Sequence, residues 1–146
     1  MNVIEVISKC EELLEVESTR ESLLECFNIV ENELAFEYFP LYATHICQSD
    51  TVYYTEFEYS PVRIVGCNCA FKLYPQYMQS KEIIKEIKYT YEPSNKSLRD
   101  ECSYGDEFLL CLTYGIISEY LLSQGFYEEA AVWDNKYKKE IKFLMI

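Results

Sequence analysis

Histidine, the side chain most often used as a base at neutral pH, occurs once in this sequence, as His45. A cysteine–histidine or serine–histidine pair would have to use it, and no motif of that kind surrounds it. The residue lies near the junction of an expected helix and an expected strand. We therefore interpret it as an ordinary loop or sheet-end residue and predict no catalytic residue.

Cys67 and Cys69 could begin a metal site, with Cys47, Cys102 or His45 as further ligands. Structural zinc sites usually separate paired ligands by about two to four residues on a turn. Here a single residue separates the pair, and on a strand this spacing places both side chains on one face. We therefore predict sheet core and no metal ligand. The odd number of cysteines, seven, at irregular spacing is typical of a reducing compartment.

Phosphate-binding and paired-carboxylate sites are not supported by the sequence. The chain has four glycines, and none belongs to a glycine-rich loop followed by a Lys-Ser/Thr pair. Acidic residues are many but follow helix faces, as Glu11, Glu12 and Glu15 do, which is typical of solvated surface. We expect no cofactor, and we expect that the protein is not an enzyme.

Hydrophobic periodicity defines the elements that would position any site. Ser18 and Glu21 have the spacing of a capping box, and Pro40 disfavours helix at the residue before it. The expected helices span about 2–16, 19–38, 104–124 and 126–143. The expected strands span about 51–58, 62–73 and 82–91. This order predicts an α+β fold in a single domain, 1–146, in which two N-terminal and two C-terminal helices form a bundle and a small antiparallel sheet is inserted between them.

Alternation within the strands predicts which side chains share a face. In the third strand the pattern places Ile83, Ile87 and Tyr91 on one face. In the second strand it places Val65 and Leu73 on one face with the cysteines between them. A three-stranded meander is the simplest arrangement of these strands.

The segment TYGIISEYLLSQGFYEEAAVWDNKYKKEIK, residues 113–142, predicts two helices folded back on each other. Gly125 stands where a left-handed cap residue is needed, small residues permit close approach of the backbones, and aromatic residues anchor one helix. The structural residues of this hairpin are Gly125, Ala130, Ala131, Trp133 and Tyr137. A solenoid needs at least about three stacked repeats, and a single copy is present, so a repeat array is excluded.

The net charge of −12 disfavours contact with phosphate backbones, so no sequence-specific nucleic-acid binding is expected. There is no apolar run of spanning length and no basic segment followed by an apolar one. We therefore expect neither a transmembrane helix nor a signal peptide, and no membrane partner. The 14 tyrosines fit either sheet positions or surfaces partly buried against another chain.

Four segments resemble, in the same order, the head-to-tail connector (adaptor or neck) proteins of tailed bacteriophages. They are LLECFNIVENELAFEYFPL (23–41), VYYTEFEYSPVRIVGC (52–67), IKYTYEPSNKSLRDE (87–101) and LTYGIISEYLLSQGFYEEAAVWDNKYKKEI (112–141). The last is the most specific, through Tyr114-Gly115, Glu119-Tyr120, Gly125, Glu129-Ala130-Ala131 and Trp133-Asp134-x-x-Tyr137. Residues 1–17 carry no motif of the family.

The resemblance implies a structural virion protein of the neck, assembled in the cytoplasm of the bacterial host. It implies a homo-oligomeric ring, expected to be twelve-fold, that binds the portal protein on one side and the tail or a second neck protein on the other. The genome would pass through the ring, and an acidic surface suits a channel in which DNA must slide without binding.

The chain ends in an apolar run at a position where chains are normally polar. We predict that this run is a partner interface that docks on a neighbouring subunit or on the portal; the alternative is that it folds back onto its own bundle. Its residues are Phe143, Leu144, Met145 and Ile146. A different function also fits the sequence: a small cytosolic adaptor that uses one tetratricopeptide-like hairpin, with a groove lined by Tyr114, Tyr120 and Tyr127.

Overall fold

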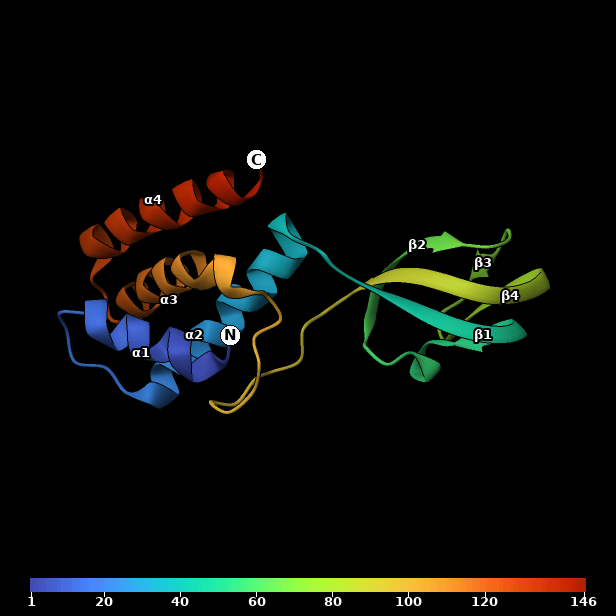
Figure 1. The fold of residues 1–146 in the computed structure, drawn as a ribbon, viewed down its shortest axis with the longest axis horizontal. Coiled ribbons are helices and arrows are strands. Elements are labelled where there is room, and N and C mark those ends of the chain that lie inside the picture. The colour runs from blue at the N-terminus through green and yellow to red at the C-terminus, as the bar shows by residue number, and fades with distance from the viewer. The chain divides into compact units, whose positions relative to one another are not determined.

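The computed structural model describes residues 1–146 and shows an α+β fold with four α-helices and a four-stranded antiparallel sheet (Figure 1). The helices are α1 (Val3–Leu13), α2 (Arg20–Glu33), α3 (Leu109–Ser123) and α4 (Tyr127–Leu144). The strands are β1 (Leu41–Tyr53), β2 (Pro61–Cys67), β3 (Lys72–Leu73) and β4 (Tyr77–Tyr91). The predicted class, with two helices before an inserted sheet and two after it, is confirmed.

The chain divides into two compact units. The helical unit consists of Met1–Leu34 and Ser94–Ile146, and the sheet unit consists of Ala35–Pro93. The helical unit is therefore built from two separate stretches of sequence. The sequence was expected to form a single connector-like domain over 1–146. This expectation stays a prediction, although the structure divides into two compact units.

Side-chain caps fix where the first two helices begin. The side-chain oxygen of Asn2 accepts a hydrogen bond from the amide of Glu5 at 3.1 Å, which opens α1. The hydroxyl of Thr19 accepts one from the amide of Ser22, also at 3.1 Å, which opens α2. The cap expected at Ser18 is thus displaced by one residue. At its other end α2 continues into a π-helical turn, Leu34–Tyr38, that ends before the proline.

The helix α3 forms the centre of the helical unit. It packs against each of the other three helices, and Figure 1 shows it between α4 and α1. A helix with neighbours on several sides must be apolar on several sides, and α3 is the most thoroughly buried helix of the protein. Its fully buried side chains include Cys111, Leu112, Ile116 and Ile117. The first two helices, which pack on it, contribute the fully buried Val3, Ile7, Leu23 and Phe27.

The sheet has the order β1-β4-β2, and β3 pairs with β4 beyond the end of β2. Its core consists of Val52, Phe57, Met78, Ile84, Ile87 and Tyr89. The first strand differs from the expected 51–58, because β1 begins at Leu41 and ends at Tyr53. Residues 41–50 alternate between half-buried and exposed, but small and polar residues on that stretch give the sequence little hydrophobic contrast. The last part of the expected strand is a 3-10 turn, Tyr54–Glu56, that leads the next residue into the core.

The expected strand at 62–73 is broken in two by a turn centred on Asn68. The side-chain oxygen of Asn68 accepts hydrogen bonds from the amides of Lys85 at 2.8 Å and Glu86 at 3.2 Å. Its side-chain nitrogen donates to the carbonyl of Ile83 at 3.1 Å. The Asn68 side chain thus satisfies backbone groups of β4 that a paired strand would otherwise satisfy, and it stabilises an irregularity in β4.

The irregularity in β4 changes which side chains face the core. Ile83, expected on the same face as Ile87, is 51% exposed, whereas Ile84 is fully buried. The pairing of β1 with β4 shifts register on both sides of the Ser49–Ile84 pair. Strict alternation therefore fails over this stretch, and the strand is also longer than the expected 82–91 because it begins at Tyr77.

Candidate functional site

Gly125 connects the two helices of the C-terminal hairpin. Its φ angle is 84°, a left-handed conformation, and its amide donates to the carbonyl of Leu122 at 3.1 Å. The amide of Phe126 donates to the carbonyl of Leu121 at 2.9 Å, which satisfies a second carbonyl at the end of α3. A side chain added at Gly125 would meet no atom within 4 Å, so the turn depends on backbone conformation and not on space.

The closest approach within the hairpin involves a glycine that the sequence analysis did not single out for packing. A β-carbon on Gly115 would lie 2.8 Å from a ring carbon of Tyr137 and 2.9 Å from a methyl group of Val30. The Tyr137 ring is buried in this space, and its hydroxyl donates to a carboxylate oxygen of Glu33 at 2.9 Å. Gly115 and Tyr137 together therefore hold α4 against α3 and α2.

The two alanines near the turn lie in different environments. Ala130 is buried, and its carbonyl accepts a hydrogen bond from the Ser118 hydroxyl of α3 at 2.9 Å. Ala131 is exposed. The close approach expected of both residues is therefore made by Ala130, because consecutive residues on a helix point about 100° apart.

Trp133 lies at the surface of the hairpin, half-buried. Its ring centroid is 5.7 Å from that of Tyr114 on α3, and the ammonium of Lys136 lies 4.1 Å from the Trp133 centroid. This is cation–π geometry, and it covers the indole with a charged group. Trp133 thus joins α3 to α4 at the surface, one helical turn before the buried Tyr137.

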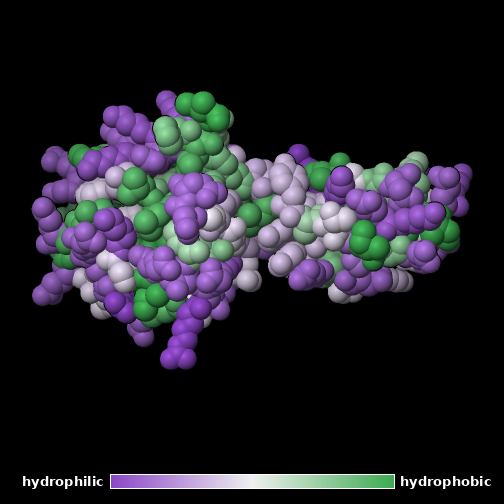
Figure 2. Space-filling view, in the orientation of Figure 1, coloured by the Kyte–Doolittle hydropathy of each residue, from purple (hydrophilic) through white to green (hydrophobic).

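The apolar C-terminal run continues the line of α4 beyond its last buried residue, Ile141. Phe143 is 71% exposed, Met145 is 54% exposed and Ile146 is fully exposed, while Leu144 is half-buried. Figure 2 shows hydrophobic atoms gathered where α4 ends. The alternative for this run was that it folds back onto its own bundle. Its side chains at Phe143, Met145 and Ile146 are exposed and do not pack there.

Cations precede this apolar tip on α4. Their side chains are exposed, and only one acidic residue, Glu140, interrupts them between residues 136 and 142. They are Lys136, Lys138, Lys139 and Lys142, out of 13 Lys and Arg in a chain of net charge −12. The end of α4 is therefore a basic and apolar surface on an otherwise acidic protein.

A buried ion pair in the helical unit was not foreseen from the sequence. Glu31 is 1% exposed, and the ammonium of Lys96 donates to it at 3.0 Å. The amide of Ser103 donates to its other oxygen at 2.9 Å. The side chain of Asn28 accepts from the amide of Lys96 at 2.8 Å and donates to its carbonyl at 3.2 Å. These bonds attach the chain that returns from the sheet to one face of α2.

The cysteines are free thiols in packed surroundings. Burial raises the pKa of Cys10, Cys102 and Cys111 to about 12, so these thiols are protonated at neutral pH. No group of three or more His, Cys, Asp or Glu side chains is placed to hold a metal ion. His45 lies within β1 and not at its end as expected; its ring packs 4.8 Å from that of Phe57.

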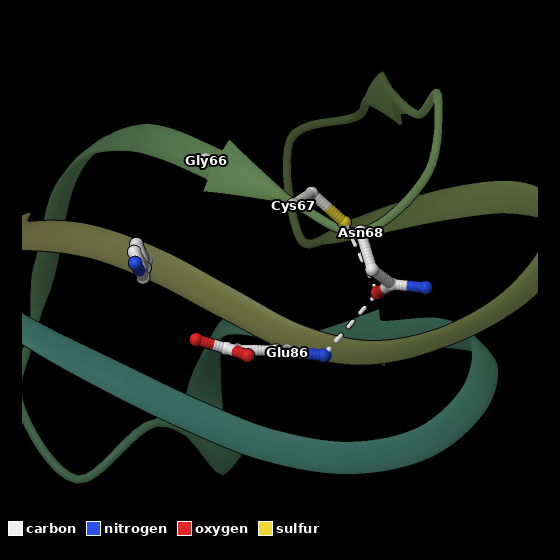
Figure 3. Close-up of a pocket in the computed structure, with 5 residues that line it drawn as sticks. Gly66, Cys67, Asn68 and Glu86 are labelled. Carbon is white, nitrogen blue, oxygen red and sulfur yellow. Dashed lines mark hydrogen bonds between the residues drawn. The ribbon is translucent and has the colours of Figure 1, made fainter.

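A hollow of about 270 Å³ opens on the sheet unit and is lined by Gly66, Cys67, Asn68, Glu86 and Lys88 (Figure 3). The Asn68 side chain in this hollow is occupied, because it is bonded to the backbone of β4. Burial raises the pKa of the Cys67 thiol, which opposes formation of a reactive thiolate. The hollow is therefore a consequence of the Asn68 turn and offers no activated group.

Comparisons with known proteins assign no family to the chain, so the functional proposal depends on its sequence and geometry. No protein family model matches the sequence, and no curated protein matches it either. None of the helices combines the length and the apolar composition that crossing a membrane requires.

Proposed function

We propose that the protein is a structural virion protein, a subunit of a head-to-tail connector ring that joins the portal to the tail and continues the DNA channel. In this proposal the ring is twelve-fold, is assembled in the host cytoplasm and becomes part of the virion neck. The observation that carries the proposal is the end of α4, an exposed apolar surface presented on a rigid helix.

The end of α4 has the properties of a docking element. Exposed apolar side chains on a helix surface are stabilised when a partner covers them. Ile141 and Tyr137 are buried just before the exposed residues, so the tip is held in place by the bundle. Because lysines precede the apolar tip on the same helix, the best partner surface is an apolar pocket with acidic residues beside it, on the portal or on a neighbouring subunit.

The charge of the protein is compatible with a channel. A net charge of −12 opposes binding of a nucleic-acid backbone, and DNA that has to move through a ring must not be held by it. The packed α3–α4 hairpin and the Glu31–Lys96 pair hold the elements of the helical unit together.

The alternative adaptor function loses support from the positions of its tyrosines. Tyr120 is buried, and its hydroxyl donates to the carbonyl of Glu17 at 2.7 Å, so it lines no open groove. Tyr127 is exposed at the first turn of α4, and Tyr114 packs on Trp133. The three rings do not form one surface.

Light scattering of the purified protein, alone and with its candidate portal, tests the proposal. We expect a ring, either alone or on the portal. Deletion of 143–146 should leave a folded protein that no longer joins the portal, whereas Ile29→Ser, a change at an exposed apolar residue of α2, should leave joining intact. A monomer or dimer that does not bind the portal would refute the connector, and loss of folding on the deletion would refute the docking role of the tip.

A further inference from the structure

The strand β1 leaves one long edge of the sheet open. Its hydrogen-bonded neighbour is β4 on one side, and no backbone group outside β4 pairs with residues 41–48. The far end of the strand differs, because the Ser49 hydroxyl accepts from the amide of Thr51 and a Glu56 oxygen accepts from the amide of Tyr53. The open part of the edge is therefore confined to 41–48.

The open part lacks the features that usually protect an edge strand from pairing. Residues 38–49 contain no Asp, Glu, Lys or Arg, although charged residues make up 26% of the chain. Tyr42 and Ile46 are 66% and 71% exposed on it. Protected edges carry lysine, proline within the strand or inward charges, and this edge carries none of these between 41 and 48.

The opposite edge of the same sheet, formed by β2 and β3, has the complementary charge. The one charged residue of β1 is Asp50, whereas the charged residues of β2 and β3 are Arg63 and Lys72. The two edges thus carry charges of opposite sign and no charge of the same sign.

The two edges also lie at matching levels along β4. Leu41 and Pro61 are both paired with Tyr91, and Thr51 and Lys72 are both paired with Gln79. Both edges run antiparallel to β4, so they are parallel to each other. A second copy placed beside the first at the same level would bring its Asp50 next to the level of Lys72.

We infer that β1 of one copy pairs in parallel with β2 of the next copy, so that the sheets of neighbouring subunits join head to tail. This inference rests on the proposed connector function and names the surface through which its subunits meet. A head-to-tail contact between two different edges leaves one open edge at each end of a growing assembly and closes as a ring. Antiparallel pairing of β1 with β1 would stop at two copies.

Two edge variants and a matched control test the pairing. Tyr42→Lys/Ile46→Lys places lysines on the β1 edge, where they repel the cationic edge of the next copy. Val62→Glu/Val65→Glu places carboxylates on β2, where charged side chains protect the edge from pairing with the uncharged stretch 41–48. The control is Ile83→Lys, which changes an equally exposed residue of the inner strand β4. All the substituted side chains are exposed, so far-ultraviolet circular dichroism should show folded proteins.

Light scattering measures the mass of each protein, alone and mixed with the portal. We expect a ring for the wild type and the control and a 17.3 kDa monomer for each edge variant. An equimolar mixture of the two variants should associate again, because the intact β2 edge of one variant meets the intact β1 edge of the other, and the introduced lysines meet the introduced carboxylates.

Each other outcome overturns a distinct statement. A ring that survives both edge variants refutes the strand pairing and leaves the connector function standing. A dimer lost in the β1 variant and kept in the β2 variant shows β1–β1 pairing and refutes the head-to-tail contact. A wild-type protein that forms no ring alone or on the portal refutes the connector function itself, and with it the inference.

Discussion

Replacing Gly115 by alanine sets two effects of opposite sign against each other. In a helix interior, glycine to alanine stabilises by about 1 kcal/mol through helix propensity. The added methyl group would lie 2.8 Å from the ring of Tyr137 and 2.9 Å from Val30, closer than real carbon contacts allow. Overpacking of this kind costs about 1–3 kcal/mol.

The surroundings of Tyr137 decide the sign. The ring is buried, and its hydroxyl is bonded to Glu33 at 2.9 Å, so a retreat from the new methyl group would lengthen that bond. A broken hydrogen bond of this type costs about 1 kcal/mol more. We therefore expect Gly115→Ala to lower the free energy of unfolding by about 1–3 kcal/mol, the sum of the two costs less the gain in helix propensity.

Urea unfolding followed by circular dichroism measures this change. Ala131→Gly supplies the matched control, because Ala131 is exposed on α4 and the change reports helix propensity alone, at a cost of about 1 kcal/mol. A Gly115→Ala/Val30→Ala double variant should lose less stability than the sum of the two single changes, since Val30→Ala, itself costly in the core, removes one of the two clashing side chains. Stabilisation by Gly115→Ala would show that Tyr137 does not pack against Gly115 and would refute the packing described for the hairpin.

Three further perturbations follow from the same structure. Gly125→Ala should cost about 1–2 kcal/mol in urea unfolding through its left-handed backbone, and Gly125→Asn should cost less; equal stability of Ala and Gly would contradict the positive φ. Glu31→Ala should cost about 3–5 kcal/mol by leaving the Lys96 ammonium unpaired, and Glu31→Met/Lys96→Met should recover most of it; a small cost for the single change would show a solvated pair. Burial raises the folded-state pKa of Cys10 and Cys111 from 9.0 to about 12, so the contribution of these buried thiols to stability is complete below pH 9 and is lost as the pH rises toward 12. Urea midpoints of the protein at pH 7 and pH 10.5, with both cysteines in place, measure this loss. An unchanged midpoint would contradict the burial of the two thiols.

The helices could be predicted from the sequence because their information is local. Apolar residues recur at helical spacing, polar caps stand at the starts, and Gly125 stands at the end of α3. The cap of α2 was misplaced by one residue because Ser18 and Thr19 are both good caps and the choice between them depends on the surrounding chain.

The parts that the sequence did not reveal depend on partners distant in the chain. Asn68 looks like an ordinary turn residue until its contacts with the backbone near Lys85 are known. Gly115 looks like a weak point in a helix until Tyr137 is placed against it. Glu31 resembles its exposed acidic neighbours, and only the approach of Lys96 makes its burial favourable.

The division of the helical unit into two stretches has a consequence for synthesis on the ribosome. The sheet unit, Ala35–Pro93, is contiguous and is complete before any residue of α3 has been made. The helices α1 and α2 therefore emerge with their apolar faces uncovered, and they stay so until α3 follows. During that interval a nascent chain exposes Val3, Ile7, Leu23 and Phe27 to solvent or to a chaperone. The order of elements thus makes closure of the helical bundle wait for the hairpin of α3 and α4, which follows the other helices in the chain.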